Sequence, residues 1–290
     1  PLIDVVFGDW RADLRQTASI ATMLGGIDLL MVDHYGLDRN WESGMRKYAK
    51  RILAVDDLAD RDHDCDFLLD QNLRYNACTR YTNRVPPGTR QFIGPQFAML
   101  RDEFDDPALL RPRDGSVTRL LAFFGGTDPG NQSLKLIDAL TLLGKSAPMT
   151  TLILGPAHPD REMVHARAAG LQNLTILNNT DSMATLLARA DLAVGTCGVA
   201  AWERCAVGLP SLVVVTAENQ REDAEILNAF GAIQNLGHAE QLDAVDFAAA
   251  LDSLLNDPIK VRNMGNFAAA IMVGREKALT KLQEALFVNS

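Results

Sequence analysis

The chain has 290 residues, enough for two domains of ordinary size. Hydrophobic residues make up 47% and charged residues 22%, which is the balance of a soluble globular protein. The net charge is −9, with no run of Lys or Arg, and this argues against nucleic acid or an anionic membrane as the main partner.

The four cysteines lack the CxxC spacing of zinc sites, so neither a metal nor a disulfide framework is expected. Cys197 and Cys205 are predicted to pack as small apolar residues. No apolar stretch is long enough to span a bilayer, and no signal peptide is recognisable. We therefore expect a cytoplasmic protein without a membrane span.

The first part of the chain alternates predicted strands with helices. A strand is expected over 3–7, and the chain begins at Pro1 without an initiator Met, so we expect an N-terminal domain that is incomplete at its start. Helices are expected over 10–24, capped by Asp9, and over 40–50, with strands over 27–32, 51–55 and 67–69. The pattern weakens over 76–94, and 96–104 is expected to be a short helix or irregular.

Polar residues stand directly after three of these strands, namely Asp33, His34 and Tyr35, then Asp56 and Asp57, then Asn72. If the strands are parallel, these residues line one rim of one sheet, where α/β proteins hold ligands. Neighbours in an extended chain point to opposite faces, so only one of Asp56 and Asp57 can face a given site. The pattern leaves structural roles open, with His34 as a lone strand-end histidine and the aspartates as a solvated acidic turn.

Residues 105–115 are expected to form a linker, because they combine two prolines with alternating charges. A second alternation begins at Arg119, with strands expected over 120–124, 151–154, 174–177, 192–194 and 211–215. Helices are expected over 132–143, 161–169, 182–189 and 199–206, and a further helix is expected to start within 216–221 and to run to about 230. Further helices are expected over 239–255, 258–264 and 274–287. The predicted domains are therefore 1–110 and 116–273, and 274–290 is expected to be a C-terminal helix that packs back on the first domain.

Two turns of the second domain are built from small residues. Gly125-Gly126-Thr127-Asp128 joins a strand to a helix and suits a phosphate cradle, but it is neither GxGxxG nor a P-loop, so neither NAD nor ATP is supported. Gly195 and Gly198 are expected to turn the backbone tightly and to leave amides uncovered at the start of helix 199–206. Glu203 lies one turn further on, where a carboxylate can accept hydrogen bonds from a ribose. An ordinary βαβ crossover without a ligand is the alternative.

Asn219 and Gln220 follow the strand over 211–215. Their amides both donate and accept hydrogen bonds, which suits sugar hydroxyls and N-acetyl groups. The alternative for Asn219 is a structural role as the cap of the helix that follows, and the two roles are compatible.

Taken together, six motifs occur in order: Asp33-His34-Tyr35-Gly36, Asp56-Asp57, Asp70-Gln71-Asn72, Gly125-Gly126-Thr127-Asp128, Trp202-Glu203-Arg204-Cys205 with Gly208-Leu209-Pro210, and Glu218-Asn219-Gln220-Arg221. From about residue 28 to 230, this series resembles the UDP-2,4-diacetamido-2,4,6-trideoxy-β-L-altropyranose hydrolases of pseudaminic acid biosynthesis, relatives of the glycosyltransferase that makes lipid II. The resemblance implies an α/β protein with two Rossmann-like domains of the GT-B type facing each other across a cleft.

The resemblance also implies a reaction, in which water attacks the sugar C1 with inversion and UDP is released. It implies no metal or other cofactor, a UDP-sugar and UDP as the small-molecule partners, a monomer, and a place in the pathway that serves flagellin glycosylation. Uridine and ribose are then held by Gly198, Val199, Ala200 and Glu203, the diphosphate lies near Gly125, Gly126 and Thr127, and the sugar is reached by Asn219 and Gln220. The implied catalytic candidates are Tyr35, Asp33, His34 and Asn219, with Asp57 and Asn72 on the same rim.

Two departures from the family pattern modify these expectations. Val199-Ala200-Ala201 is apolar where the family carries hydroxyl residues, which predicts weaker binding through backbone amides. The family's Gly-x-Gly-His-x-x-Arg loop, whose His is thought to act on the attacking water, does not occur in the sequence. We therefore expect this chain to bind UDP and to hydrolyse poorly. A GT-B glycosyltransferase that uses a UDP-N-acetylhexosamine, or a catalytically incomplete UDP-sugar-binding protein, are the alternatives, and a dehydrogenase is disfavoured.

Overall fold

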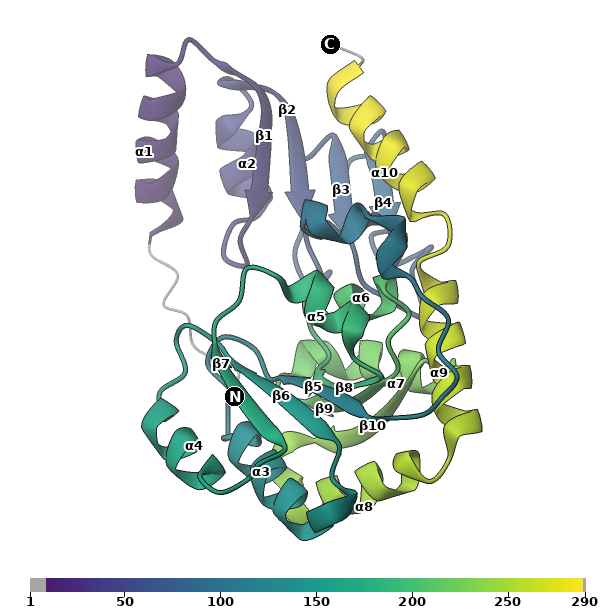
Figure 1. The fold of residues 1–290 in the computed structure, drawn as a ribbon. Coiled ribbons are helices and arrows are strands. Elements are labelled where there is room, and N and C mark those ends of the chain that lie inside the picture. Colours follow the sequence, from purple (N-terminus) through teal and green to yellow (C-terminus); the bar gives the residue numbers. More distant parts are fainter. Residues whose placement is uncertain (1–8, 289–290) are drawn as a thin grey trace. The chain divides into compact units, whose positions relative to one another are not determined.

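The structure, a computed structural model, describes residues 9–288, which divide into two compact units (Figure 1). The described residues up to Met99 group with those from Gly274 onward, and Leu100–Val273 form the other unit. Each unit is built on a wholly parallel sheet with helices packed against it. The strand expected over 3–7 lies outside the described residues.

The sheet of the first unit has the order β1-β2-β3-β4, with strands Ile27–Asp33, Ala49–Val55, Phe67–Asp70 and Arg90–Ile93. Because side chains alternate along a strand, one face of this sheet packs Ile52 and Leu68 against Trp41 and Met45 of α2 (Arg39–Met45) and the small residues of α1 (Trp10–Met23). The side chain of Asp9 accepts a hydrogen bond from the backbone of Arg11, which confirms the predicted helix cap.

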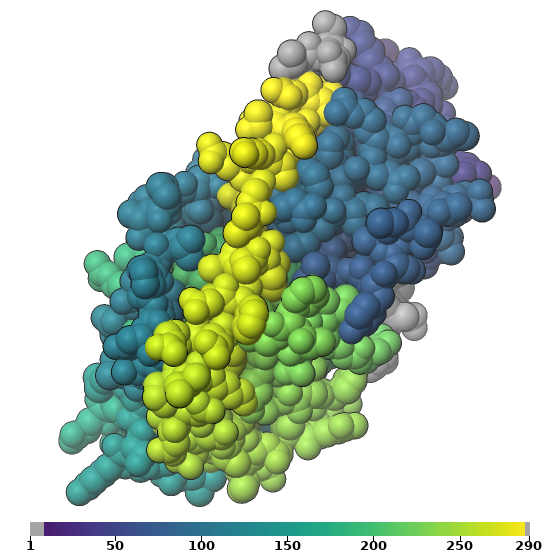
Figure 2. Space-filling view, turned by 90° about the vertical axis from the view of Figure 1, so that its right-hand side faces the viewer, coloured from purple at the N-terminus to yellow at the C-terminus, as the bar shows by residue number. Residues whose placement is uncertain are grey.

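The C-terminal residues belong to this first unit. Helix α10 (Arg275–Gln283) and the π-helical turn Glu284–Val288 place Leu282, Ala285 and Leu286 against Leu53, Phe67, Leu69 and Phe92 on the second face of the sheet. Figure 2 shows this segment in yellow on the surface of the blue residues that precede Met99. The first unit therefore combines residues from both ends of the described range, and the second unit consists of the residues between them.

The second unit has a six-stranded sheet of order β10-β9-β8-β5-β6-β7, with strands Arg119–Phe123 (β5), Met149–Leu154 (β6), Leu174–Asn178 (β7), Leu192–Thr196 (β8), Ser211–Val215 (β9) and Ile233–His238 (β10). This is the strand order of the Rossmann fold, and the winding direction reverses between β5 and β8. In open α/β sheets, ligands bind at such a switch point, beyond the carboxyl ends of its strands.

Both faces of the second sheet are covered. On one face, Leu120 and Ala122 pack against α3 (Gln132–Leu143) and α8 (Ala244–Leu255), and on the other, Leu121 and Ala193 pack against α5 (Met183–Arg189). The remaining helices are α4 (Arg161–Ala168), α6 (Val199–Ala206), α7 (Arg221–Ala229) and α9 (Pro258–Ile271). Two buried faces explain why β8 and β9 are continuous runs of buried residues.

Several expected elements differ from the structure. The helix expected over 40–50 ends at Met45, because β2 begins at Ala49, which already pairs with Ile27 of β1. Strands β4 and β10 were not expected, and α9 continues to Ile271 rather than 264. The segment expected as a linker, 105–115, packs within the second unit, where Leu109 joins the apolar cluster around Leu121.

Among residues 9–288, no helix combines the length and apolar character that crossing a membrane requires. Within the same range, no three His, Cys, Asp or Glu side chains are grouped as metal ligands would be.

Candidate functional site

The loop after β5 presents open backbone at the switch point. Gly125 has a φ of +90°, and a Cβ added to Gly125 or Gly126 would meet no atom within 4 Å. The loop is anchored by Asp128, whose carboxylate accepts hydrogen bonds from the backbone of Gln132 and Ser133 at 2.9 Å and lies 3.2 Å from His158 Nε2. Asp128 therefore holds the first backbone amides of α3 and is buried, while Gly126 and Thr127 before it are exposed.

The loop after β8 differs from its prediction at Gly195. The strand continues through Gly195 and Thr196, and the turn falls at Cys197 and Gly198. A Cβ on Gly195 would lie 2.5 Å from the carbonyl oxygen of Phe123. Gly195 thus permits the close approach of β8 to β5 and does not form the turn. Gly198 occupies the N-cap of α6, whose first backbone amides lack partners within a helix.

Glu203 lies one turn into α6, where the sequence predicted it, and is half-buried. Its Oε1 accepts a hydrogen bond from Arg101 Nη2 at 3.2 Å, and Arg101 Nη1 lies 2.9 Å from Glu103 Oε1. Burial raises the pKa of Glu203, and the charge and hydrogen bond of Arg101 oppose this shift. The carboxylate is thus held in place by a partner that is itself half-exposed.

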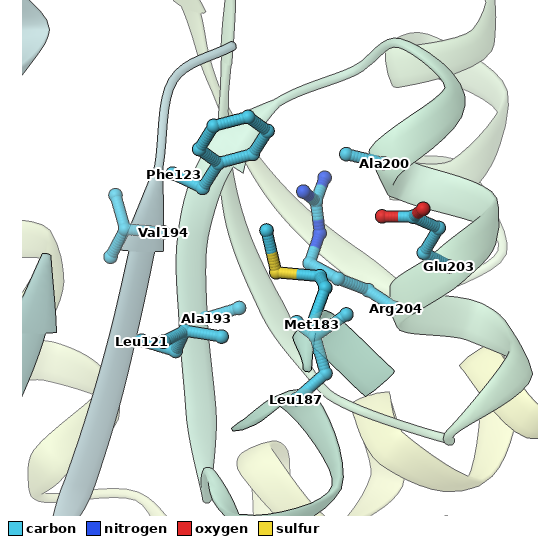
Figure 3. A pocket seen from close by; sticks show the side chains of 9 residues that line it. All are labelled: Leu121, Phe123, Met183, Leu187, Ala193, Val194, Ala200, Glu203 and Arg204. Carbon is cyan, nitrogen blue, oxygen red and sulfur yellow. The ribbon is translucent and has the colours of Figure 1, made fainter. Parts of the chain in front are cut away.

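A small pocket beneath α6 contains both Glu203 and Arg204 (Figure 3). Its walls are mostly apolar and come from β5, α5, β8 and α6: Leu121, Phe123, Met183, Leu187, Ala193, Val194 and Ala200. The cavity volume is about 10 Å³, which is the space of about one water molecule. A nucleobase or ribose therefore cannot occupy this pocket as it stands.

Gln220 lies beside the α6 turn. Its Oε1 accepts hydrogen bonds from the backbone N and Oγ1 of Thr216, each at 3.2 Å, and its amide nitrogen lies 3.9 Å from the position of a Cβ on Gly198. Asn219 is exposed in the 3-10 turn Glu218–Gln220. This extra turn shifts the start of α7, so its N-cap is Gln220, and the prediction that Asn219 caps the helix was wrong.

The rim predicted in the first unit has the expected strand arrangement. β1, β2 and β3 are parallel neighbours, so the residues that follow them lie at one edge of the sheet. Tyr35 Oη donates to Asp57 Oδ2 at 3.2 Å, which brings these two candidates together. Asp56 is buried and lies 2.9 Å from Arg61 Nη1, whereas Asp57 contacts Tyr35.

The other rim candidates have local contacts. Asp33 is exposed, and His34 Nδ1 accepts a hydrogen bond from the backbone of Gly36 at 3.1 Å. Asn72 is half-buried and its backbone donates to Asp70 Oδ1 at 3.1 Å. Each of these two contacts joins residues that are two positions apart in the chain.

Sequence reasoning missed a buried polar network beneath this rim. His63 Nδ1 lies 2.8 Å from Glu42 Oε1, His63 Nε2 lies 3.7 Å from Asp56 Oδ2, and Arg61 Nη1 lies 2.9 Å from Asp56 Oδ1. Burial by itself lowers the pKa of His63, but the hydrogen bonds and charges of Asp56 and Glu42 raise it to about 9. Burial raises the pKa of Asp56, but His63 and Arg61 hold it well below its usual range.

A second set of buried groups fixes the position of Asp57. Tyr81 Oη donates to Asp70 Oδ2 and to the Asp56 carbonyl, each at 3.1 Å. Arg80 Nη2 donates to the Asp57 carbonyl at 2.6 Å, and Arg80 Nε lies 3.2 Å from Asp70 Oδ2. These contacts therefore connect the end of β2 to the end of β3. In the sequence, the sign of this connection is the acidic residue that follows each predicted strand.

Similarity to known proteins was found in sequence and in structure. No family model matches the chain. Three proteins are about a quarter identical to this chain over the aligned residues. They are an uncharacterised protein of Methanocaldococcus jannaschii (25% over 203 residues, 67% of this chain and 42% of that protein), the spore coat polysaccharide biosynthesis protein SpsG of Bacillus subtilis (26% over 157 residues, 54% and 46%), and the UDP-2,4-diacetamido-2,4,6-trideoxy-beta-L-altropyranose hydrolase of Campylobacter jejuni (25% over 161 residues, 55% and 56%). The chain spans about half the length of these curated relatives.

Solved structures match over nearly the whole chain. MurG of Acinetobacter baumannii superposes with a TM-score of 0.58 at 15% identity, covering 95% of this chain and 77% of MurG. UGT89C1 of Arabidopsis thaliana in complex with UDP gives a TM-score of 0.65 at 14% identity, covering 98% and 80%. The chain has the two parallel-sheet α/β domains of GT-B glycosyltransferases. This confirms the prediction of an α/β protein with two parallel-sheet domains of the GT-B type.

Proposed function

We propose that this chain acts on a nucleotide-sugar, and that its second unit binds the UDP part. The observation that carries the proposal is the open backbone of Gly125-Gly126 and of Gly198, in the loops that follow the two strands flanking the switch point. Small-residue loops and a helix N-terminus can surround a diphosphate with backbone amides, which need no counter-ion from a metal. The similarity to a UDP-sugar hydrolase and the structural likeness to a UDP complex support UDP as the nucleotide.

Within this proposal, different residues around α6 contact different parts of the ligand. Val199 and Ala200 offer backbone amides, and the Glu203 carboxylate accepts the ribose hydroxyls after Arg101 yields its place. Gly125, Gly126 and Thr127 lie toward the diphosphate, and Asn219 and Gln220 lie toward the sugar. Since Val199 and Ala200 carry no side-chain donors, the backbone supplies the polar contacts at the start of the helix.

For the reaction, we propose hydrolysis of UDP-2,4-diacetamido-2,4,6-trideoxy-β-L-altropyranose. Water forms the new bond at C1, the C1–O bond to UDP breaks, and UDP leaves as an anion. The attacking water must lose a proton, and a carboxylate held by a neighbouring hydroxyl is a suitable acceptor. At the rim, Asp57 has this arrangement, because its carboxylate accepts a hydrogen bond from the Tyr35 hydroxyl. Asp33, His34 and Asn72 are proposed to line the same rim.

Glycosyl transfer is the second candidate function, because the structural likeness is to GT-B glycosyltransferases. In that reaction an acceptor hydroxyl replaces water, and the nucleotide site is unchanged. The two functions therefore share the second unit and differ only in whether an acceptor is required.

The decisive experiment measures UDP release by the purified chain without an acceptor, from the diacetamido-trideoxy UDP-sugar and, separately, from UDP-N-acetylglucosamine. Release from the first substrate alone supports the hydrolase. Release that begins only after an acceptor extract is added supports the transferase. If UDP raises the melting temperature while neither substrate is turned over, the chain is a UDP-binding protein, and absence of both signals refutes the proposal.

A further inference from the structure

Arg204 of α6 is a buried cation that no carboxylate neutralises among residues 9–288. Its exposed fraction is 3%, and Nη2 donates to the Thr196 carbonyl at 2.7 Å. In the described part of the chain, Nε has no hydrogen-bond partner and no Asp or Glu oxygen lies within 4.0 Å of the guanidinium. Burial lowers the pKa of Arg204, because removing an unpaired charge from water is costly.

Neither Glu203 nor Cys205 supplies the missing negative charge. The carboxylate of Glu203 favours the charged guanidinium, but it is hydrogen-bonded to Arg101 instead. Burial raises the pKa of the Cys205 thiol to about 12, so this sulfur stays protonated at neutral pH. A buried charge in such a setting is usually paired or bound to a ligand, and this one requires an explanation.

The guanidinium lies directly beneath the switch point. Nη1 is 3.0 Å from the position that a Cβ on Gly195 would occupy, and the Phe123 carbonyl is 2.5 Å from that same position. Phe123 and Gly195 are paired residues near the carboxyl ends of β5 and β8. Figure 3 shows the guanidinium rising from the pocket between Phe123 and Ala200, toward the first turn of α6.

We propose that Arg204 supplies the positive charge for the diphosphate of the bound nucleotide and so determines the preference for a nucleoside diphosphate over a nucleoside. This inference rests on the proposed nucleotide site. The charge adds to the partial positive charge of the α6 N-terminus, and the low-dielectric surroundings of a buried side chain strengthen its attraction for an anion. An anion at the turn would in return stabilise the charged form of Arg204.

The test compares uridine, UDP and inorganic pyrophosphate, each titrated calorimetrically into the full chain. In R204M, we expect UDP to bind about tenfold or more weakly, pyrophosphate binding to be lost, and uridine affinity to change less than about threefold. R204K keeps the charge and is expected to retain most of the preference for UDP. In the wild-type chain, UDP affinity should fall with added salt while uridine affinity stays constant.

Arg113 provides a matched control. Its Nη1 donates to the carbonyls of Val207 and Gly208 at 2.8 and 3.0 Å, so it holds the opposite end of α6 by the same kind of contact. R113M therefore removes a carbonyl-bound arginine without removing charge at the switch point. We expect R113M to lower the melting temperature and to leave the ratio of UDP to uridine affinity unchanged.

Other outcomes overturn the inference in distinct ways. Equal weakening of UDP and uridine in R204M, or wild-type behaviour in that variant, shows that Arg204 only holds Thr196. If R204M does not fold, R204K and the salt dependence decide, and a salt-independent preference for UDP overturns the inference. Binding of UDP that does not depend on Arg204 refutes this inference alone. A wild-type chain that binds pyrophosphate but not UDP refutes the proposed nucleotide function, and with it this inference, which rests on that function.

Discussion

At the scale of single residues, Glu203 and Arg204 are neighbours in sequence with separate expected effects on the ligand. Glu203 is proposed to accept hydrogen bonds from the ribose hydroxyls, and both uridine and UDP contain this ribose. E203Q should therefore weaken both ligands by about tenfold, because a charge-assisted hydrogen bond is lost. Calorimetric titration of both ligands measures this, with the exposed Glu225 of α7 as the control in E225Q. Unequal effects of E203Q on the two ligands would contradict the ribose assignment.

Glu203 also predicts a pH dependence. Because burial raises its pKa, the side chain gains a proton at a higher pH than an exposed glutamate does. Uridine affinity is expected to decrease as the pH is lowered through this raised pKa in the wild-type chain, and to stay level over the same range in E203Q. Uridine is the appropriate ligand here, since its own charge does not change in acid in the way that a diphosphate's does.

Tyr35 and Asp57 test the reaction at the same scale. If Asp57 accepts the proton of water, D57N should lower kcat at least about 100-fold, and Y35F should lower it less, because the carboxylate remains. UDP affinity should be unchanged in both variants, as neither residue lies in the unit proposed to hold the nucleotide. Y48F, directly before the start of β2 rather than after its end, is the control in a UDP-release assay. Normal turnover in D57N would refute a catalytic role.

At the scale of elements, two glycines of the second unit have different reasons to be glycine. G195A places a Cβ 2.5 Å from the Phe123 carbonyl between two central strands, so we expect a loss of about 2–4 kcal/mol in the free energy of unfolding. G126A meets no atom within 4 Å, and its effect on unfolding should stay within about 0.5 kcal/mol. G126A should instead weaken UDP binding, because the added methyl group fills the proposed cradle. Urea denaturation and UDP titration of the pair separate the two roles.

The network beneath the first rim predicts how stability depends on pH. A histidine whose pKa is raised from 6.5 to about 9 in the folded chain stabilises it fully below pH 6.5 and loses this contribution as the pH rises toward 9. We expect the free energy of unfolding of the first unit to fall by about 1–3 kcal/mol over this window. In H63Q this dependence should be absent, and urea denaturation at pH 6.5 and 9 provides the comparison. A wild-type slope that persists in H63Q would exclude His63 as its source.

The same elements show what the sequence could predict. Periodicity and capping located most helices and the strands with continuous apolar runs, such as β8 and β9. The apolar pattern did not reveal β4 and β10, because Arg90-Gln91 and Gln234-Asn235 interrupt it in these two strands at the sheet edges. Gly195 was misread as a turn because a glycine required by a neighbouring strand looks the same in sequence as one required by a turn.

At the scale of the whole molecule, the two-domain α/β fold was predictable, whereas the position of the switch point was not. The order of strands in the second sheet depends on the pairing of β5 with β8, which α3, β6, α4, β7 and α5 separate in the sequence. The network of Glu42, Asp56 and His63 arises in the same way, since each residue alone reads as an ordinary polar position. Candidate residues that stand in one loop can thus be named from the sequence, whereas groups that tertiary pairing brings together cannot.

The path of the chain gives a last prediction. Because Leu282 of α10 packs against the sheet of the first unit, although Leu100–Val273 precede it in sequence, L282A should destabilise that unit by about 2–5 kcal/mol. Backbone amides of β2 and β3 should then exchange hydrogen faster in mild urea, while those of β5 and β8 keep their protection and UDP still binds. L254A, in the core of the second unit, should produce the reverse pattern. Equal loss of protection in both sheets in either variant would mean that the two units unfold as one, and that the C-terminal helix stabilises the molecule as a whole.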